Sequence, residues 1–183
     1  MEISITYIIS QIFTIIMYAL LAISYYAKER KKVLILSFVS LIANGIAYIL
    51  LNAYSGLAMC ALALVRNIIF IVDENKNGKR EKITKKDIAI LIILYAIAII
   101  SAIFTYEGFL SLFSIFATML YTYSVWQKKT RVYKFLGIPI GILWMLYNFY
   151  IKSIFGVILE AILFICSVTG YILEVRKSKK EKN

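Results

Sequence analysis

Seven apolar segments, separated by short stretches that hold nearly all the charged residues, constrain the fold of this 183-residue chain. A helix that crosses the roughly 30 Å hydrocarbon layer of a membrane needs about 20 apolar residues. The chain is 62% hydrophobic, so segments of this length leave no room for a separate soluble domain. We predict a single all-α membrane domain over 1–183, with seven transmembrane helices at 4–26, 33–51, 55–72, 88–105, 109–126, 134–150 and 153–173.

The basic residues indicate which side of the membrane each loop occupies. Of the 21 lysines and arginines, all except Arg66 and Lys152 follow the first, third, fifth or seventh apolar segment. Lysine and arginine are enriched in cytoplasmic loops, so the N-terminus is predicted to lie outside and the C-terminus in the cytoplasm. The formal charge of +11 is then explained by membrane orientation, and nucleic acid is not an expected partner.

The two halves of the chain repeat with an offset of 100 residues. Residues that align without a gap include Ser24 with Ser124, Lys28 with Lys128 and Gly56 with Gly156. Polar residues in the first, second, fifth and sixth segments recur every three or four positions, which places them on one face of each helix. We predict a first triple-helix repeat at 4–72, a linker helix at 88–105 and a second triple-helix repeat at 109–175. Because the single linker returns the chain to its starting side, the repeats are expected to be parallel.

Two charged side chains, Arg66 and Glu160, lie inside predicted membrane helices. A charge at the bilayer centre costs about 2.5–3.5 kcal/mol on insertion scales, and such residues usually face the bundle interior or a water-filled cavity. Glu160 is expected either to contact a substrate or a coupling proton, or to form a neutral hydrogen bond between helices. Arg66 either orients an anionic group or extends its side chain to the inner surface.

Amide and aromatic groups at membrane depth complete the predicted substrate site. Amides supply hydrogen-bond donors and acceptors, and aromatic rings supply flat faces for a planar ligand. Hydrogen bonding between helices is the alternative role for each of these residues. The remaining members of the site are Gln11, Asn44, Asn67, Trp144, Tyr147 and Asn148.

Enzymatic and metal chemistry have few candidate residues in this sequence. The chain has no histidine, which removes the commonest general base and the commonest metal ligand. Cys60 and Cys166 both lie in predicted membrane helices, so we expect buried thiols and no disulfide. No nucleotide-binding motif is present. We predict a protein that is not an enzyme and has no cofactor or metal site, with an intramembrane enzyme as the remote alternative.

Three segments carry a resemblance to a known family: ALVRNIIFIV, which ends at residue 72, SIFATMLYTYSVWQKKTRVYKF (114–135) and YNFYIKSIFGVILEAILF (147–164). They resemble the YgjV-type bacterial inner membrane proteins over nearly the whole chain. The resemblance implies a multi-pass protein of the bacterial inner (plasma) membrane. That family is similar in layout to the SWEET and PnuC transporters, which have three helices, one linker helix and three more helices.

The similarity to SWEET proteins implies a pair of substrate residues in each triplet. SWEETs line their site with a tryptophan on the second helix and an asparagine on the third helix of a triplet. Trp144 and Glu160 correspond to this pair in the second triplet, and Asn44 and Cys60 in the first. Glutamate in place of asparagine, and the absence of a tryptophan from the first pair, argue against a sugar as the substrate.

These features together predict a transporter or facilitator of a small polar metabolite, working by alternating access around a midplane cavity. A non-transporting sensor or partner subunit is the alternative, and it would need no continuous polar path. The expected partners are a small-molecule substrate and the lipid bilayer. Two complete repeats favour a monomer, and the pattern also allows a homodimer.

Overall fold

The computed structural model describes residues 5–52, 54–77, 83–104, 111–150 and 154–180, and every regular element in these ranges is a helix. The prediction of an all-α protein is therefore confirmed for the described part of the chain. The helices are α1 (Ile5–Ser24), α2 (Arg30–Leu50), α3 (Tyr54–Asn77), α4 (Lys85–Phe104), α5 (Ser111–Trp126), α6 (Thr130–Tyr150) and α7 (Ile154–Lys180).

Four of the described segments are long and apolar enough to cross a membrane: Ile5–Ser24, Arg30–Leu50, Thr130–Tyr150 and Phe155–Lys180. The segment Leu112–Trp126 is apolar and shorter. Large apolar side chains are exposed along the helices, among them Ile92, Ile100 and Ile103 of α4. A soluble monomer rarely exposes so much apolar surface, so these side chains fit contact with lipid. Crossing by all seven helices and an outside N-terminus stay predictions.

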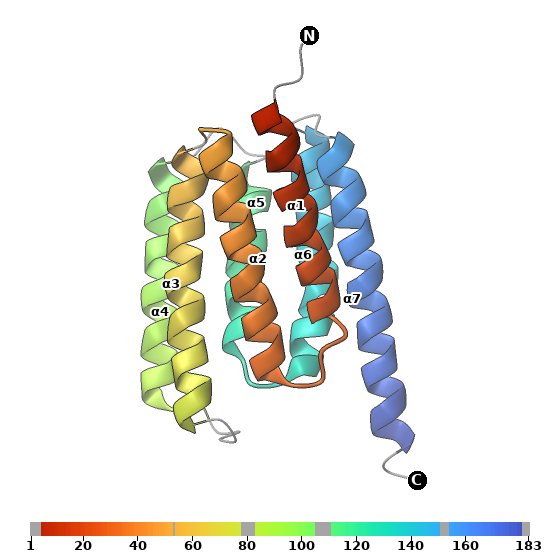
Figure 1. Ribbon diagram of the computed structural model, residues 1–183. Helices are drawn as coiled ribbons and strands as arrows, with labels where there is room; N and C mark the ends of the chain where they lie inside the picture. Colours follow the sequence, from red (N-terminus) through yellow and green to blue (C-terminus); the bar gives the residue numbers. More distant parts are fainter. Residues whose placement is uncertain (1–4, 53, 78–82, 105–110, 151–153, 181–183) are drawn as a thin grey trace. The chain divides into compact units, whose positions relative to one another are not determined.

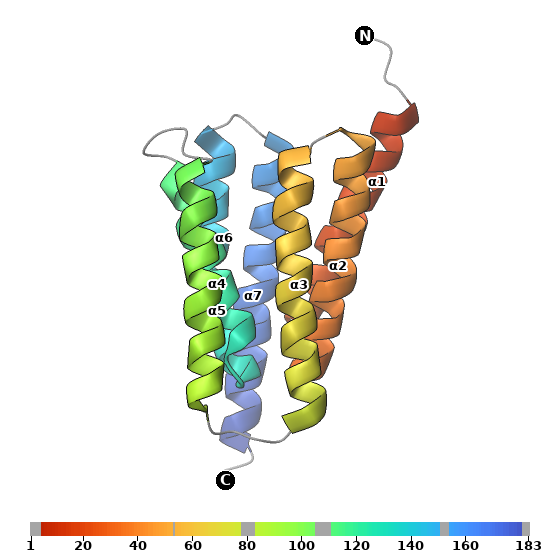
Figure 2. The same ribbon diagram turned by 90° about the vertical axis from the view of Figure 1, so that its left-hand side faces the viewer.

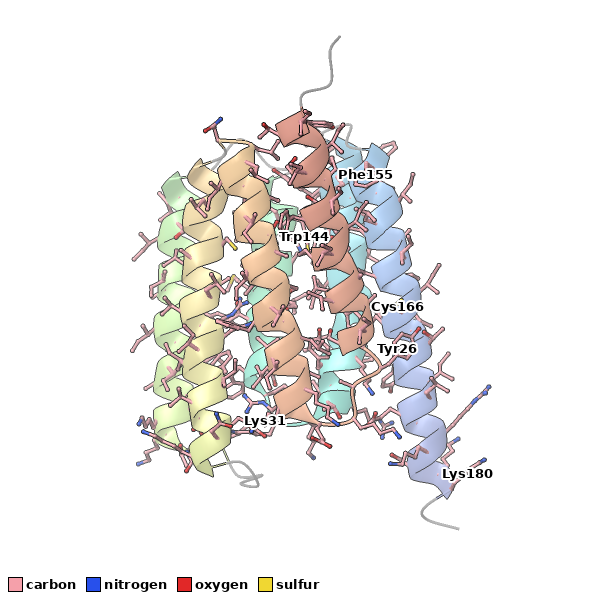
Figure 3. All side chains as sticks on the ribbon, in the orientation of Figure 1. Tyr26, Lys31, Trp144, Phe155, Cys166 and Lys180 are labelled. Atoms are coloured by element: carbon pink, nitrogen blue, oxygen red, sulfur yellow. The ribbon has the colours of Figure 1, made fainter. Side chains whose placement is uncertain are left out.

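The chain divides into two compact units, Met1–Lys79 and Arg80–Asn183. In unit 1, α2 packs against both α1 and α3 (Figures 1 and 2). The turn after α1 lies at one end of this unit, where Lys31 is labelled in Figure 3. We call this the basic end, because Lys28, Lys31, Lys32 and Lys76 all lie there. Leu51 and Asn52 close α2 at the opposite end, where Asn52 adopts a left-handed φ of 54°. Asparagine tolerates this conformation at a helix C-terminus better than most residues do.

In unit 2, α4 packs against α5, α5 against α6, and α6 against α7. The first turn of α4 is capped by Thr84 and Asp87, since the carboxylate of Asp87 accepts hydrogen bonds from the Thr84 backbone N–H at 2.7 Å and hydroxyl at 2.8 Å. The indole N–H of Trp126, at the end of α5, donates to the backbone carbonyl of Asp87 at 2.9 Å. α4, the helix predicted to be the linker, is therefore anchored within unit 2. We call the end of unit 2 where Lys180 lies its basic end, and Phe155 lies at the other end of α7 (Figure 3).

Several helices extend further than the apolar segments predicted. The helix predicted at 33–51 begins at Arg30, and the one predicted at 134–150 begins at Thr130. The helices predicted to end at 72 and 173 continue to Asn77 and Lys180. Hydropathy marks where a helix leaves the hydrocarbon layer, whereas the backbone hydrogen bonds continue into the polar interface. α1 is shorter than predicted and ends at Ser24, and the predicted ends at 4, 105, 109 and 153 fall outside the described residues.

The internal register of the two units is the same after a shift of 100 residues. α2 and α6 begin and end at equivalent positions, at 30 and 50 in one unit and at 130 and 150 in the other. Ser24 and Ser124 are both buried, and each donates to the carbonyl three residues earlier, at 2.6 and 2.7 Å. Arg30 pairs with Glu74 in unit 1, and Thr130 donates to Glu174 in unit 2 at 3.2 Å. The two units share these local features, and the internal repeat itself stays a prediction.

Candidate functional site

The face of α7 that packs on α6 is defined by four contacts spaced along both helices. A Cβ on Gly141 would lie 3.3 Å from the Cβ of Phe164, so the two helices approach closely there. Ser167 donates to the carbonyl of Lys134 at 2.6 Å, and the Tyr171 ring lies 5.5 Å from that of Phe135. The Lys134 ammonium pairs with Glu174 at 2.6 Å. The α7 positions are therefore 164, 167, 171 and 174, and the same spacing continues to 160.

Glu160 occupies this α6-facing stripe of α7, two heptads before Glu174. The carboxylate of Glu174 meets Thr130 and Lys134 on the opposite helix. Position 160 lies fourteen residues before 174 on α7, and positions 144 and 148 lie fourteen residues after 130 and 134 on α6. Because the two helices run in opposite directions, the same register places Glu160 opposite Trp144 and Asn148. Glu160 is buried and takes part in interactions within the protein. Sequence reasoning paired Glu160 with Trp144 through the SWEET layout, and the register of α6 and α7 places them at the same level.

Trp144 belongs to a small aromatic and amide cluster on α6. Its ring meets Tyr147 edge to face, with centroids 5.8 Å apart and an interplanar angle of 80°. Asn148 donates from Nδ2 to the Trp144 carbonyl at 2.9 Å, which fixes the orientation of the amide. All three side chains are partly exposed in the protein. Within the described residues, the Trp144 indole N–H, the Tyr147 hydroxyl and the Asn148 amide oxygen form no hydrogen bonds.

Trp144 and Glu160 lie at the same depth from the end of unit 2 that is opposite the basic end. Trp144 is six residues from Tyr150, the last residue of α6, and Glu160 is six residues from Ile154, the first residue of α7. At 1.5 Å per residue both lie about 9 Å from that end. Figure 3 shows Trp144 well inside the length of its helix. The level is therefore within the apolar part of both helices.

Unit 1 has the equivalent level between α2 and α3. Cys60, which corresponds to Glu160, is buried and donates from Sγ to the carbonyl of Leu41 at 3.1 Å. Asn44, which corresponds to Trp144, is partly exposed on α2. Among the residues that the structure describes, the Asn44 amide makes no hydrogen bond. A Cβ on Gly45 would be 3.7 Å from the Cys60 sulfur, so the two helices are in ordinary contact there.

A buried polar cluster lies deeper in unit 1, toward its basic end. Asn67 is fully buried, donates from Nδ2 to the Ser37 hydroxyl at 2.9 Å and accepts from Arg66 Nε at 3.4 Å. Ser40 is also buried and donates to the Ser37 carbonyl at 2.8 Å. The bond from Asn67 to Ser37 joins α3 to α2, so these two residues contribute to helix packing, which was the alternative role for Asn67.

The remaining predicted site residues are Arg66 and Gln11. Arg66 is buried, with about 6% of its surface exposed, and its guanidinium takes part in interactions within the protein. It lies twelve residues from the start of α3, roughly 9 Å deeper than the level of Cys60. Gln11 is partly exposed on α1 and donates to Ser10 at 3.4 Å, a long hydrogen bond.

Sequence reasoning missed the ion pairs at the basic end of each unit. Arg30 and Glu74 pair in unit 1, with 7% and 12% of their side chains exposed, and Lys134 and Glu174 pair in unit 2. These residues were assigned to loops or helix ends because charge marks the limit of an apolar segment. The equivalence of Glu74 and Glu174 under the offset of 100, fourteen residues beyond Cys60 and Glu160, was the available signal.

A groove of about 390 Å³ lies at the basic end of unit 1. It is lined by apolar side chains and by Lys32, and its members are Ile23, Tyr26, Ala27, Lys32, Ile35 and Leu36. They lie at the end of α1, in the turn after it or in the first two turns of α2, away from the level of Asn44. The groove is therefore separate from the predicted substrate residues.

Comparison with known proteins gives one family. A family model named Imp-YgjV and described as a bacterial inner membrane protein matches residues 8–179. No curated protein and no solved structure matches the chain.

Proposed function

Since the chain belongs to this family of bacterial inner membrane proteins, and is therefore a multi-pass protein of that membrane, we propose that it transports a small polar metabolite by alternating access. The observation that carries the proposal is a pair of equivalent positions. Asn44 in unit 1 and Trp144 in unit 2 each lie six residues before the last residue of their own helix, and within the described residues neither side chain forms a hydrogen bond.

The cost of leaving polar groups without partners in a membrane makes this arrangement informative. An amide or indole N–H in hydrocarbon costs several kcal/mol unless it is hydrogen-bonded. Asn44 and Trp144 are partly exposed and about 9 Å from the helix ends, and the short Asn44 side chain cannot reach the interface from that position. Water or a polar ligand therefore supplies their partners, and either one requires a polar path into the membrane.

The packing of each unit separates structural polar groups from candidate ligand groups. Ser37, Asn67 and Ser167 bond across helices and hold the units together. Asn44, Trp144, Tyr147 and Asn148 keep hydrogen-bonding capacity that the described residues do not use. We assign substrate contact to this second group, together with Glu160, which lies at the level of Trp144.

Solvent access from each side of the membrane tests the proposal. Single cysteines at Asn44 and Trp144, in a background with Cys60 and Cys166 replaced by alanine, are treated with a charged thiol reagent on one side at a time. Ile42 and Leu146, which are exposed apolar residues on the same helices, provide matched cysteine controls for lipid-facing positions. We expect labelling of N44C and W144C from both sides and none at the controls.

The labelling pattern also separates transport from the sensor or partner-subunit alternative. A sensor pocket opens to one side only, so labelling restricted to one side would favour that function. Failure to label N44C and W144C from either side, with the variants folded, would refute the proposed polar path. Uptake of a panel of amino acids, nucleosides, vitamins and amines into proteoliposomes then identifies the substrate.

The role of Glu160 is tested by replacing it with glutamine, which keeps its size and one oxygen, carries an NH2 donor in place of the other oxygen, and cannot ionise. If Glu160 carries a coupling proton, E160Q loses accumulation against a gradient and its uptake no longer responds to a pH difference. If Glu160 only binds substrate, E160Q raises the KM and keeps the response to pH. Unchanged uptake with unchanged pH dependence would remove Glu160 from the mechanism.

A further inference from the structure

We propose that the groove at the basic end of unit 1 binds an anionic phospholipid, with an acyl chain along its apolar lining and the phosphate group at Lys32. The groove has a volume of about 390 Å³ and is formed by the end of α1, the turn after it and the start of α2. Its lining residues are separate from the predicted substrate residues, so the proposal goes beyond transport and concerns how the chain contacts its membrane.

The groove lies where two candidate membrane helices reach one surface of the bilayer. α1 and α2 are both long and apolar enough to cross a membrane, and only residues 25–29 join them. A connection this short keeps the groove at the boundary between hydrocarbon and water. Tyr26 and Lys31 lie toward this end of unit 1 (Figure 3), and tyrosine is enriched at such boundaries. A phospholipid presents its acyl chains and its headgroup at this depth.

The lining of the groove is suited to a hydrocarbon chain. Ile23, Tyr26 and Ile35 are exposed, and Ala27 and Leu36 complete the apolar wall. Covering exposed apolar surface with hydrocarbon is favourable in proportion to the area removed from water. An acyl chain therefore gains contact with the groove that a small water-soluble anion does not.

The charge beside the groove is positive and favours an anionic headgroup. The Lys32 ammonium lies 3.4 Å from the Glu29 carboxylate, and both side chains are 63% exposed, so this pair is weak. Lys28 and Lys31 are exposed next to it, whereas Arg30 is already neutralised by a carboxylate of α3. The lysines outnumber Glu29, and basic residues at the ends of membrane helices attract anionic lipids.

The positions 100 residues later in unit 2 are filled by the protein itself. Tyr26 is 46% exposed, whereas Trp126 is 8% exposed and donates its indole N–H to α4 at 2.9 Å. Gln127 stands where unit 1 has Ala27, and its amide oxygen accepts from the Lys129 backbone N–H at 2.8 Å. Unit 1 has a small side chain at the position where unit 2 closes the turn with an amide.

The basic residue of the groove differs between the units in the same way. Position 132, which is 100 residues after Lys32, is valine. Unit 1 therefore combines an open apolar surface at Ala27 with a positive charge at Lys32, and unit 2 has neither at the equivalent positions. Both differences lie in one groove, and together they match the two chemical parts of an anionic phospholipid.

Quenching of a tryptophan by brominated lipids measures lipid contact at the groove itself. The full-length protein with Tyr26→Trp and Trp144→Phe is reconstituted in phosphatidylcholine vesicles. These contain a rising fraction of phosphatidylglycerol with brominated acyl chains, or brominated phosphatidylcholine as the zwitterionic reference. Trp126 is buried, and a protein with Trp144→Phe alone gives its signal for subtraction.

We expect phosphatidylglycerol to bind beside Tyr26→Trp at least about fivefold more tightly than phosphatidylcholine. Lys32→Gln should remove most of this preference, and Glu29→Gln should increase it because Lys32 loses a competing carboxylate. Lys76→Gln is the matched control, since it removes the same charge from the basic end but outside the groove. It should change the preference little. Ala27→Leu fills the groove and should reduce quenching by both lipids.

Equal quenching by the two lipids would overturn the proposal, as would equal losses for folded Lys32→Gln and Lys76→Gln, because general surface charge would then explain the binding. Competition by millimolar inorganic phosphate would show that the anion is recognised without its acyl chains, which would refute the lipid. Weak quenching by either lipid would also refute it, and crosslinking of cysteines at Tyr26 between two copies would identify a second chain as the occupant. Circular dichroism establishes that each variant is folded.

Discussion

Substitution of one glycine by alanine in each unit gives a matched test of helix packing. Gly141 and Gly45 both lie inside buried helix contacts, on α6 and α2 respectively. A Cβ at position 141 meets the Cβ of Phe164 at 3.3 Å and its Cα at 3.5 Å. A Cβ at position 45 meets only side-chain atoms, at 3.7 Å for Cys60 Sγ and 3.9 Å for Leu57 Cδ1.

Both substitutions gain stability from the higher helix propensity of alanine, and they differ in how the new methyl group packs against the neighbouring helix. Alanine in place of glycine within a helix stabilises by about 0.8–1 kcal/mol. At position 45 the new methyl group enters ordinary van der Waals contact, so G45A should gain most of this amount. At position 141 it presses on the α7 backbone, and the α6–α7 distance must grow by a few tenths of an ångström. Overpacking of this kind costs about 1–3 kcal/mol, so G141A should be neutral or destabilised by up to about 2 kcal/mol.

Thermal unfolding in detergent, followed by far-UV circular dichroism, measures the difference. For a chain of this size 1 kcal/mol shifts Tm by about 2–4 °C, so G45A should rise by roughly that amount and G141A should fall or stay level. The difference between the variants is the relevant quantity, because the detergent affects both equally. A rise in Tm for G141A equal to that for G45A would refute the close approach of α6 and α7.

The ion pairs and the orientation give two further predictions. Lys134→Met leaves the carboxylate of Glu174 partly buried without its cation, so we expect a loss of about 3 kcal/mol in stability, measured as a fall in Tm. Lys32 forms an exposed pair with Glu29, so Lys32→Met should change stability by less than about 1 kcal/mol. Equal effects would contradict the buried pair. For orientation, a single cysteine at Asn52 should react with an impermeant reagent in intact cells, and one at Lys129 only after permeabilisation; labelling in the opposite order would reverse the topology.

Much of the fold could be predicted because the bilayer makes apolar length and loop charge unusually direct signals. The helices α2 and α6 lie where the apolar segments placed them, and their equivalent bounds agree with the alignment of Ser24 with Ser124. The ends were less predictable, since Lys134 looks like a loop residue by its charge. In the protein it is inside α6, buried and paired with Glu174. A lysine can occupy such a position only when a carboxylate from another helix neutralises it, and hydropathy carries no information about partners.

The residues of the candidate site could be selected from the sequence, but the partner of each polar side chain could not. Glu160 and Trp144 were identified by depth and by resemblance, and the register of α6 and α7 adds that they share one level. Asn67 was predicted to contact substrate, with helix packing as the alternative, and its hydrogen bond to Ser37 supports the packing role. An amide at membrane depth satisfies the same need with a ligand, with water or with another helix, so its residue type alone does not distinguish them.

The hydrogen bond from Trp126 to the Asp87 carbonyl bears on how the protein is made. The two residues are 39 positions apart, so at about 5–20 residues per second the ribosome produces the acceptor roughly 2–8 s before the donor. During that interval the Thr84–Asp87 cap already satisfies backbone groups in the first turn of α4. We therefore expect α4 to form as a capped helix before α5 is complete. The part of unit 2 that α5 then packs against would already be in place when Trp126 leaves the ribosome.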